Sequence, residues 1–258
     1  MIDLKEIQKQ YPESLHGHKR FMLREYLQYK ILEILSNSEF SNKLIFMGGT
    51  CLRIVHSNTR FSEDLDFDNF NLQEREFEVL SSFITRKLQL EGYRVEMKTV
   101  SSGAFHCYIK FPGLLYAEDL TGYSQEKILI TIDTEPQLYS YKPDRFILNK
   151  FDIFTAIQVV PPNILLSQKF YALINRKRKK GRDFYDILFL MKNVRPDYRY
   201  LEFKTGIKNA NGLKDRILKI CENLDLHIIA LDVAPFLFNP EDVKKIELFT
   251  DYILQELS

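Results

Sequence analysis

The sequence predicts an α+β protein, with a sheet flanked by helices in residues 1–160 and a helical domain in residues 161–258. Short apolar or alternating runs, which are typical of β-strands, fill the first part. From Ile164 onward, apolar residues instead recur at helical spacing. Pro161 and Pro162 separate the two patterns, so we place the domain boundary there.

The individual elements follow from local patterns. The clearest strand is 127–135, where Ile128, Ile130 and Ile132 share one face. Strands are predicted over 43–47, 64–68, 93–100, 104–111, 127–135 and 151–160. Helices are predicted over 18–35, 50–56, 71–90, 164–175, 182–192, 213–224 and 240–257.

Composition limits the functional classes. The chain has 258 residues, of which 45% are hydrophobic and 28% charged, as expected for a globular protein. Its net charge of +1 means that any nucleic-acid-binding surface must be local. The N-terminus lacks a signal-peptide pattern and no apolar run reaches the roughly 20 residues that span a bilayer. We therefore expect a cytoplasmic protein without membrane contact, whose three cysteines stay reduced.

Asp64 and Asp66 are the first candidate site residues. Alternation along a strand places them on one face together with Asp68, opposite the apolar Leu65 and Phe67. Like charges on one face repel, and a divalent cation would remove that repulsion. Mg²⁺ prefers a few carboxylates plus substrate phosphates. The alternative is an acidic strand edge in solvent, which local physics does not exclude.

Gly48 and Gly49 lie between a predicted strand and a predicted helix. A glycine turn brings bare backbone N–H groups close to a ligand, and a helix N-terminus attracts anions. Thr50 adds a hydroxyl that could donate to a triphosphate. An ordinary strand-to-helix turn is the alternative reading of the same residues.

Asp133 is the third candidate carboxylate. It ends an apolar strand, where an unpaired charge would be costly inside the core but could reach a metal ion. It could also act as a general base toward an acceptor hydroxyl. Glu135 lies two residues further on the same face and is the alternative, and a strand end turning into solvent would need neither role.

The helical half contributes basic candidates. Lys169 shares a helix face with Arg176, where an ammonium group suits a contact with phosphate. A basic cluster follows and is a candidate nucleic-acid contact in a near-neutral protein, although such clusters are usually solvated loops. Its members are Arg176, Lys177, Arg178, Lys179, Lys180 and Arg182. Asp186 is predicted to pair with Arg182 one helical turn away.

Two strings of residues together resemble a known family. The first is Gly-Gly-Thr-x-Leu-Arg followed by Arg-Phe-Ser-x-Asp-Leu-Asp-Phe, and the second is Lys-x-x-Ala-x-x-x-Arg followed by Arg-Asp-x-x-Asp. They resemble the AbiEii/AbiGii toxin family, whose members are nucleotidyltransferases of the DNA polymerase β-like superfold. The resemblance covers roughly residues 25–190. The matching positions are Gly48, Gly49, Asp64 and Asp66 for the superfold, and Arg60, Ser62, Lys169 and Asp183 for the family.

The resemblance implies a mixed sheet in residues 1–160 and a Mg²⁺-dependent enzyme, with Mn²⁺ as the alternative ion. Such an enzyme moves NMP from an NTP to an acceptor, and characterised relatives modify the 3′ end of tRNA. Asp64, Asp66 and Asp133 would hold the metal, and Lys169 would neutralise the triphosphate. Gly48, Gly49, Thr50, Arg60, Ser62 and Asp183 would lie at the nucleotide. Arg60 could instead orient the aspartate strand, and the residues leave this open.

The resemblance also suggests a toxin of a type IV toxin–antitoxin or phage-defence system, with a cognate antitoxin as partner. Two other classes remain to be weighed against it. One is a non-catalytic module of the same fold that binds nucleotide or RNA. The other is a glycosyltransferase, which also uses Asp-x-Asp but needs about 100 residues of nucleotide-binding fold before that motif, whereas about 60 precede Asp64.

Overall fold

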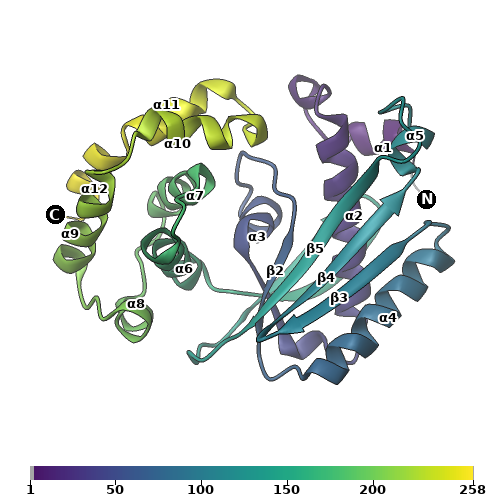
Figure 1. Cartoon of the computed structure of the whole chain (residues 1–258), viewed down its shortest axis with the longest axis horizontal. Coiled ribbons are helices and arrows are strands. Elements are labelled where there is room, and N and C mark those ends of the chain that lie inside the picture. The colour runs from purple at the N-terminus through teal and green to yellow at the C-terminus, as the bar shows by residue number, and fades with distance from the viewer. Residues whose placement is uncertain (1–2, 258) are drawn as a thin grey trace. The chain divides into compact units, whose positions relative to one another are not determined.

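The computed structural model describes residues 3–257 and divides into two compact units, which are drawn in Figure 1. The sheet unit is formed by Met1–His56 and Phe61–Val160, and the helical unit by Ser57–Arg60 and Pro161–Ser258. The sequence does not predict that Ser57–Arg60 joins the helical unit. Among the described residues, no helix is long and apolar enough to cross a bilayer.

The sheet unit is built on a seven-stranded mixed sheet in the order β3-β4-β5-β2-β1-β7-β6. Its strands are β1 (Leu44–Met47), β2 (Leu65–Asn69), β3 (Glu96–Ser102), β4 (Ala104–Pro112), β5 (Lys127–Pro136), β6 (Asp144–Lys150) and β7 (Ile153–Val159). β2 runs antiparallel to β1 and parallel to β5, so it lies at the centre of the sheet. The predicted mixed sheet is confirmed.

Helices cover this sheet. They are α1 (Leu4–Gln8), α2 (Lys19–Ser36), α3 (Gly48–Val55), α4 (Glu74–Leu90) and α5 (Leu114–Ala117), with short 3-10 turns at Glu13–Leu15 and Ser41–Lys43. α2 packs against β7 and α4, and Figure 1 shows α4 lying along β3. α3 packs on β1 and β2. The helix that begins with the glycines therefore contacts the strand that carries the aspartates.

A buried ion network ties α2 to α3. Glu25 is 3% exposed and accepts hydrogen bonds from Arg53 and Lys150, each at 2.8 Å, and from the Tyr11 hydroxyl. Burial alone would raise the pKa of Glu25, but Arg53 and Lys150 outweigh it and hold the pKa below its ordinary value. The arginine of the Gly-Gly-Thr-x-Leu-Arg string thus has a structural partner.

The helical unit contains α6 (Pro162–Asn175), α7 (Gly181–Met191), α8 (Tyr198–Thr205), α9 (Ala210–Cys221), α10 (Leu226–Val233), α11 (Lys244–Glu247) and α12 (Phe249–Glu256). Two 3-10 turns, Ala234–Phe236 and Pro240–Val243, connect the later helices. α7 packs against α6, α10 and α11, and α9 packs against α12. The three cysteines are buried and form no disulfide bond within residues 3–257; they are Cys51, Cys107 and Cys221.

The structure contains elements that the sequence did not predict, namely the helices α1, α5, α8 and α10 and the strand β6, and it divides one predicted helix. β6 was missed because it is an edge strand in which the apolar residues Phe146, Ile147 and Leu148 are consecutive and Ile147 is exposed, so its sequence shows no alternation. α10 was missed because its sequence is apolar almost throughout and shows no helical period. The predicted helix 240–257 is divided into a 3-10 turn, α11 and α12.

Candidate functional site

The register of the central strands brings the predicted carboxylates together. Asp66 on β2 lies opposite Met47 on β1 and beside Asp133 on β5. Neighbouring strands are separated by about 5 Å and side chains of paired residues share a face, so Asp66 and Asp133 are close neighbours. Glu135, the alternative, pairs with Asp68 instead. The register therefore favours Asp133 as the third carboxylate.

Burial distinguishes three aspartates, namely Asp66 and Asp68 on β2 and Asp64, which directly precedes the strand. Leu65 and Phe67 are buried at 0% and 4% exposure, whereas Asp64 and Asp66 are half-buried. Asp68 is 5% exposed and accepts a hydrogen bond from the Tyr141 hydroxyl. Asp64 and Asp66 therefore remain accessible, whereas Asp68, which alternation assigns to the same face, is buried.

Gly48 is required at its position for two reasons. Its φ of +77° lies in the left-handed region that glycine adopts without strain. A Cβ atom there would lie 2.1 Å from Oδ2 of Asp66, so any side chain would displace that carboxylate. The glycines form the first turn of α3 and do not precede it, and no side chain caps this helix. A helix N-terminus of this kind suits an anion.

The segment that leads into β2 is braced by buried side chains. The Thr50 hydroxyl donates to the carbonyl of Asp64, and Gln28 donates to the carbonyls of Ser62 and Glu63 at 3.1 and 2.9 Å. Thr50 is fully buried and Gln28 is 1% exposed. The Thr50 hydroxyl therefore positions Asp64. For the predicted contact with phosphate, only the backbone N–H of Thr50 remains. Ser62 is half-buried beside it.

His106 is a residue that sequence reasoning missed. It lies opposite Asp133 on β4, and its Nδ1 is 2.6 Å from Oδ1 of Asp133. Both side chains are about one-third exposed, at 33% and 35%. Since 27 residues separate the two positions, only the strand register could have revealed the pair.

The donor set fits a metal ion that binds together with its substrate. No group of three or more His, Cys, Asp or Glu side chains gathers into a metal-holding cluster within residues 3–257. Mg²⁺, however, is commonly held by one or two carboxylates plus substrate phosphates. Asp64 and Asp66 match that description, because they are accessible oxygen donors next to a helix N-terminus.

The helical unit contains a separate buried charge cluster. Arg60 is 1% exposed and donates to both oxygens of Asp186 at 2.7 Å. Lys169 lies 2.8 Å from Oδ2 of Asp186, and Asn58 donates to Oδ1 at 2.9 Å. Burial would raise the pKa of Asp186, but Arg60 and Lys169 hold it below its ordinary value. Of the two roles open to Arg60, this geometry supports a structural one.

The remaining predictions for this unit are corrected in part. Asp186 pairs with Arg60 and Lys169, so the predicted pair with Arg182 is wrong. Asp183 is 1% exposed, and its Oδ2 accepts a hydrogen bond from the Arg176 guanidinium at 2.7 Å. Its Oδ1 lies 3.5 Å from Nζ of Lys169. A nucleotide contact through the Asp183 carboxylate would require this pair to open. Lys169 is 12% exposed, and its predicted contact with the triphosphate stays a prediction.

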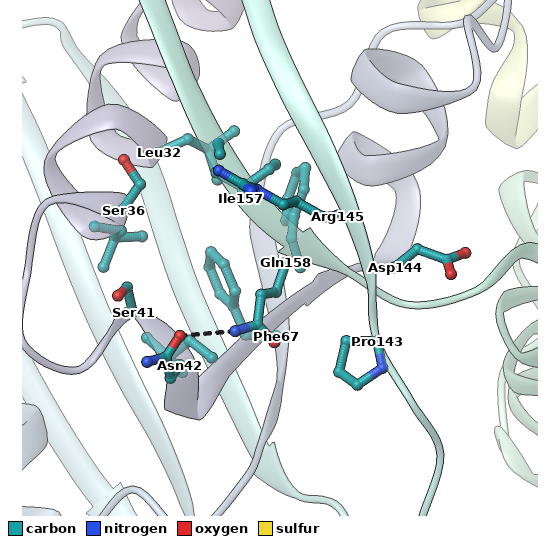
Figure 2. Close-up of a pocket in the computed structure, with 14 residues that line it drawn as sticks. Leu32, Ser36, Ser41, Asn42, Phe67, Pro143, Asp144, Arg145, Ile157 and Gln158 are labelled. Atoms are coloured by element: carbon teal, nitrogen blue, oxygen red, sulfur yellow. Dashed lines mark hydrogen bonds between the residues drawn. The ribbon is translucent and has the colours of Figure 1, made fainter.

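A pocket of about 410 Å³ lies elsewhere in the sheet unit, where β7 diverges from β1 (Figure 2). It is lined by Phe46 and Phe67, and Figure 2 shows Asn42 and Gln158 hydrogen-bonded at its edge, at 2.8 Å. Met47 follows Phe46 and Asp66 precedes Phe67. Because side chains alternate along a strand, those of Met47 and Asp66 point to the face of the sheet opposite the pocket. The pocket is therefore not part of the carboxylate site.

Solved structures share this fold. The chain resembles JHP933 from Helicobacter pylori with a TM-score of 0.55 and 16% identity, over 92% of this chain and 93% of that chain. A second H. pylori protein, described as a candidate nucleotidyltransferase, gives a TM-score of 0.52 and 15% identity, over 96% and 97%. No curated protein matches the chain. The fold is that of the nucleotidyltransferases.

The family follows from the sequence match. The model described as "Nucleotidyl transferase AbiEii toxin, Type IV TA system" matches residues 30–231, so the chain belongs to the AbiEii nucleotidyltransferase family. The match extends about 40 residues beyond the predicted end near residue 190 and includes α8, α9 and most of α10. Membership in this enzyme family decides against the glycosyltransferase and the non-catalytic module.

Replacement of Gly48 by alanine should abolish activity by displacing Asp66. The positive φ adds strain of about 1–3 kcal/mol, and the new Cβ collides with the carboxylate. We expect a lower free energy of unfolding in urea and a loss of nucleotidyl transfer. Gly113→Ala is the matched control, since its φ is +74° and nothing lies within 4 Å of the added Cβ. Equal activity of the two variants would contradict a specific role for Gly48.

Replacement of Asp186 by asparagine should strongly destabilise the protein. It leaves Arg60 and Lys169 without their carboxylate, and breaking a buried pair costs about 3–5 kcal/mol. Arg182→Ala should change the free energy of unfolding by less than about 0.5 kcal/mol, as expected for a replacement away from the buried cluster. Urea unfolding measures both values.

The stabilisation by the Asp186 carboxylate should also depend on pH. Because the folded-state pKa of Asp186 is below its ordinary value of 3.8, its stabilisation is present above that value and is lost as the pH falls through the lower folded pKa. The difference in the free energy of unfolding between wild type and Asp186→Asn should therefore become smaller as the pH falls below 3.8. A difference that stays constant from neutral pH to pH 2 would contradict this assignment.

Proposed function

We propose that the chain transfers NMP from an NTP to an RNA acceptor, with Mg²⁺ or Mn²⁺ as cofactor and tRNA as the acceptor suggested by the resemblance. The observation that carries this proposal is the sharing of one sheet face by Asp66 and Asp133, next to a helix that begins at Gly48. Carboxylates and an anion-binding helix end are the groups that a metal–triphosphate complex requires.

The residues have distinct roles in this reaction. Asp64 and Asp66 hold the metal, and the backbone at Gly48 and Gly49 faces the phosphates. The acceptor hydroxyl attacks the α-phosphorus of the NTP and forms a new O–P bond. The bond between the α-phosphorus and the oxygen that bridges to the β-phosphate breaks, and pyrophosphate leaves. Asp133 is the third proposed ligand and accepts the hydroxyl proton. A metal ion held by these carboxylates would supply positive charge that stabilises the transferring phosphoryl group. A contribution from Lys169 rests on the family resemblance alone.

The family description supports a biological role as well. We propose that the protein is the toxin of a type IV toxin–antitoxin pair, neutralised by an antitoxin protein. A role in phage defence remains an extension of this proposal. Growth arrest on expression that depends on Asp66 and is relieved by a co-encoded protein would support it.

The central test is incubation of the protein with labelled NTPs, Mg²⁺ and total RNA. Wild type should label RNA and release pyrophosphate, whereas Asp66→Asn should reduce turnover by at least about 100-fold, since removal of a group that stabilises transferring charge typically costs 10²–10³. Asp68→Asn is the matched control, because Asp68 lies on the same strand but is buried under Tyr141. Equal labelling by wild type and Asp66→Asn would overturn the proposal.

His106 should act by orienting Asp133. His106→Ala removes the partner of Oδ1, and loss of such an orienting hydrogen bond typically lowers activity by about 10–100-fold. Affinity for NTP, measured by filter binding, should stay unchanged, and His106→Asn should recover part of the turnover because its amide can donate.

His227→Ala is the control for this variant. His227 also bonds a carboxylate, Glu247 at 2.8 Å, but on the surface of the helical unit. Its removal should leave turnover unchanged. Wild-type turnover in His106→Ala would show that Asp133 needs no positioning partner.

A further inference from the structure

Two hollows in the helical unit are lined by basic side chains, and one of these side chains lines both hollows. The first, of about 730 Å³, is lined by Lys204, Arg216 and Lys219 from α8 and α9. The second, of about 470 Å³, is lined by Lys177, Arg178, Lys179 and again Lys219. We call these six cations the basic surface. Lys219 belongs to both hollows, so the surface continues from the α6–α7 loop to α9.

The basic surface is not balanced by acidic side chains. Within residues 3–257, Lys177, Arg178, Arg216 and Lys219 form no ion pair, and all four are exposed. Two acids line the hollows, Asp215 in the first and Asp232 in the second, and Asp232 already accepts from the backbone N–H of Gly181. Partial burial and the nearby Arg216 lower the pKa of Lys179. Cations held together in this way are stabilised by an anionic partner.

Aromatic rings accompany these cations. The Lys204 ammonium lies 5.9 Å from the ring centre of Tyr171 and 5.6 Å from that of Phe203. Phe203 is 54% exposed, although it is a large apolar side chain. Phosphate-binding cations next to an exposed aromatic ring are the combination by which proteins bind RNA, since the ring can stack on an unpaired base. An acidic protein partner would use the charges but would not need the ring.

We propose that the basic surface binds the phosphate backbone of the RNA acceptor, with Phe203 stacking on an unpaired base. The inference rests on the proposed function for the identity of the RNA as acceptor. It extends the candidate contact from Arg176–Arg182 to α8 and α9, where Lys204, Arg216 and Lys219 lie far away in the sequence. Lys180 and Arg182 line neither hollow.

The test compares two double variants of the full chain. Arg216→Ala/Lys219→Ala removes two cations from the basic surface, and Lys192→Ala/Arg199→Ala removes two exposed cations that line neither hollow. Binding of fluorescent tRNA is measured by anisotropy from 50 to 300 mM salt without NTP. The first variant should bind roughly tenfold more weakly, with a salt slope smaller by about 2. The control should stay within about twofold of wild type.

Two further measurements complete the test. Phe203→Ala should weaken binding of an RNA with a single-stranded 3′ end more than binding of a blunt duplex, and polyglutamate should not compete at equal charge. Equal RNA binding by both double variants, or equal competition by polyglutamate, would overturn the inference. Filter binding of NTP should be unchanged in the Arg216/Lys219 variant. A failure of wild type to transfer NMP, with the binding pattern intact, would overturn the proposed function and the identity of the RNA as acceptor, but not the binding of RNA by the basic surface.

Discussion

The site depends on the in-register position of β2 between β1 and β5. A shift of one residue would turn Asp64 and Asp66 toward the core and Leu65 and Phe67 toward the site, because side chains alternate along a strand. Burial of the two apolar side chains, at about 25 cal/mol per Å² of apolar surface, therefore fixes the direction of the two carboxylates. The same hydrophobic contacts that stabilise the sheet position the chemistry on its other face.

Rigid surroundings complement this register. Asp64 and Asp66 carry like charges on one face, so their positions must be maintained by other groups. Gln28 and Thr50 hold the carbonyls of the segment before β2, and Gly48 leaves just enough room for the Asp66 carboxylate. Arg53, which follows in the same helix as Gly48, is anchored through Glu25 to α2. Within the Gly-Gly-Thr-x-Leu-Arg string, Gly48 therefore leaves space for a site carboxylate, whereas Thr50 and Arg53 hold the surrounding backbone and helix in place.

Local patterns predicted what depends on neighbours in the chain. Alternation predicted the direction of Asp64 and Asp66, and helical spacing predicted α2, α4 and α6. Contacts between distant segments were not predictable, because nothing in one strand specifies the register of the next. His106 therefore remained unseen beside Asp133, and Asp186 was assigned to Arg182, its neighbour by one helical turn. The observed partner, Arg60, is 126 residues away and offers two parallel hydrogen bonds in a buried setting, which outweigh a single exposed pair.

The net charge of +1 conceals an uneven distribution. Residues 1–160 carry 19 Lys and Arg against 22 Asp and Glu, whereas residues 161–258 carry 17 against 13. A metal-binding carboxylate pair needs surroundings that do not already neutralise it, and a polyanion-binding surface needs cations without acidic partners. These demands conflict within a single small surface. In this chain the two sets of groups are separated along the sequence: Asp64 and Asp66 lie at and just before β2, and Arg216 and Lys219 lie on α9. This separation is what the proposed metal site and the proposed RNA-binding surface would require of a nearly neutral protein.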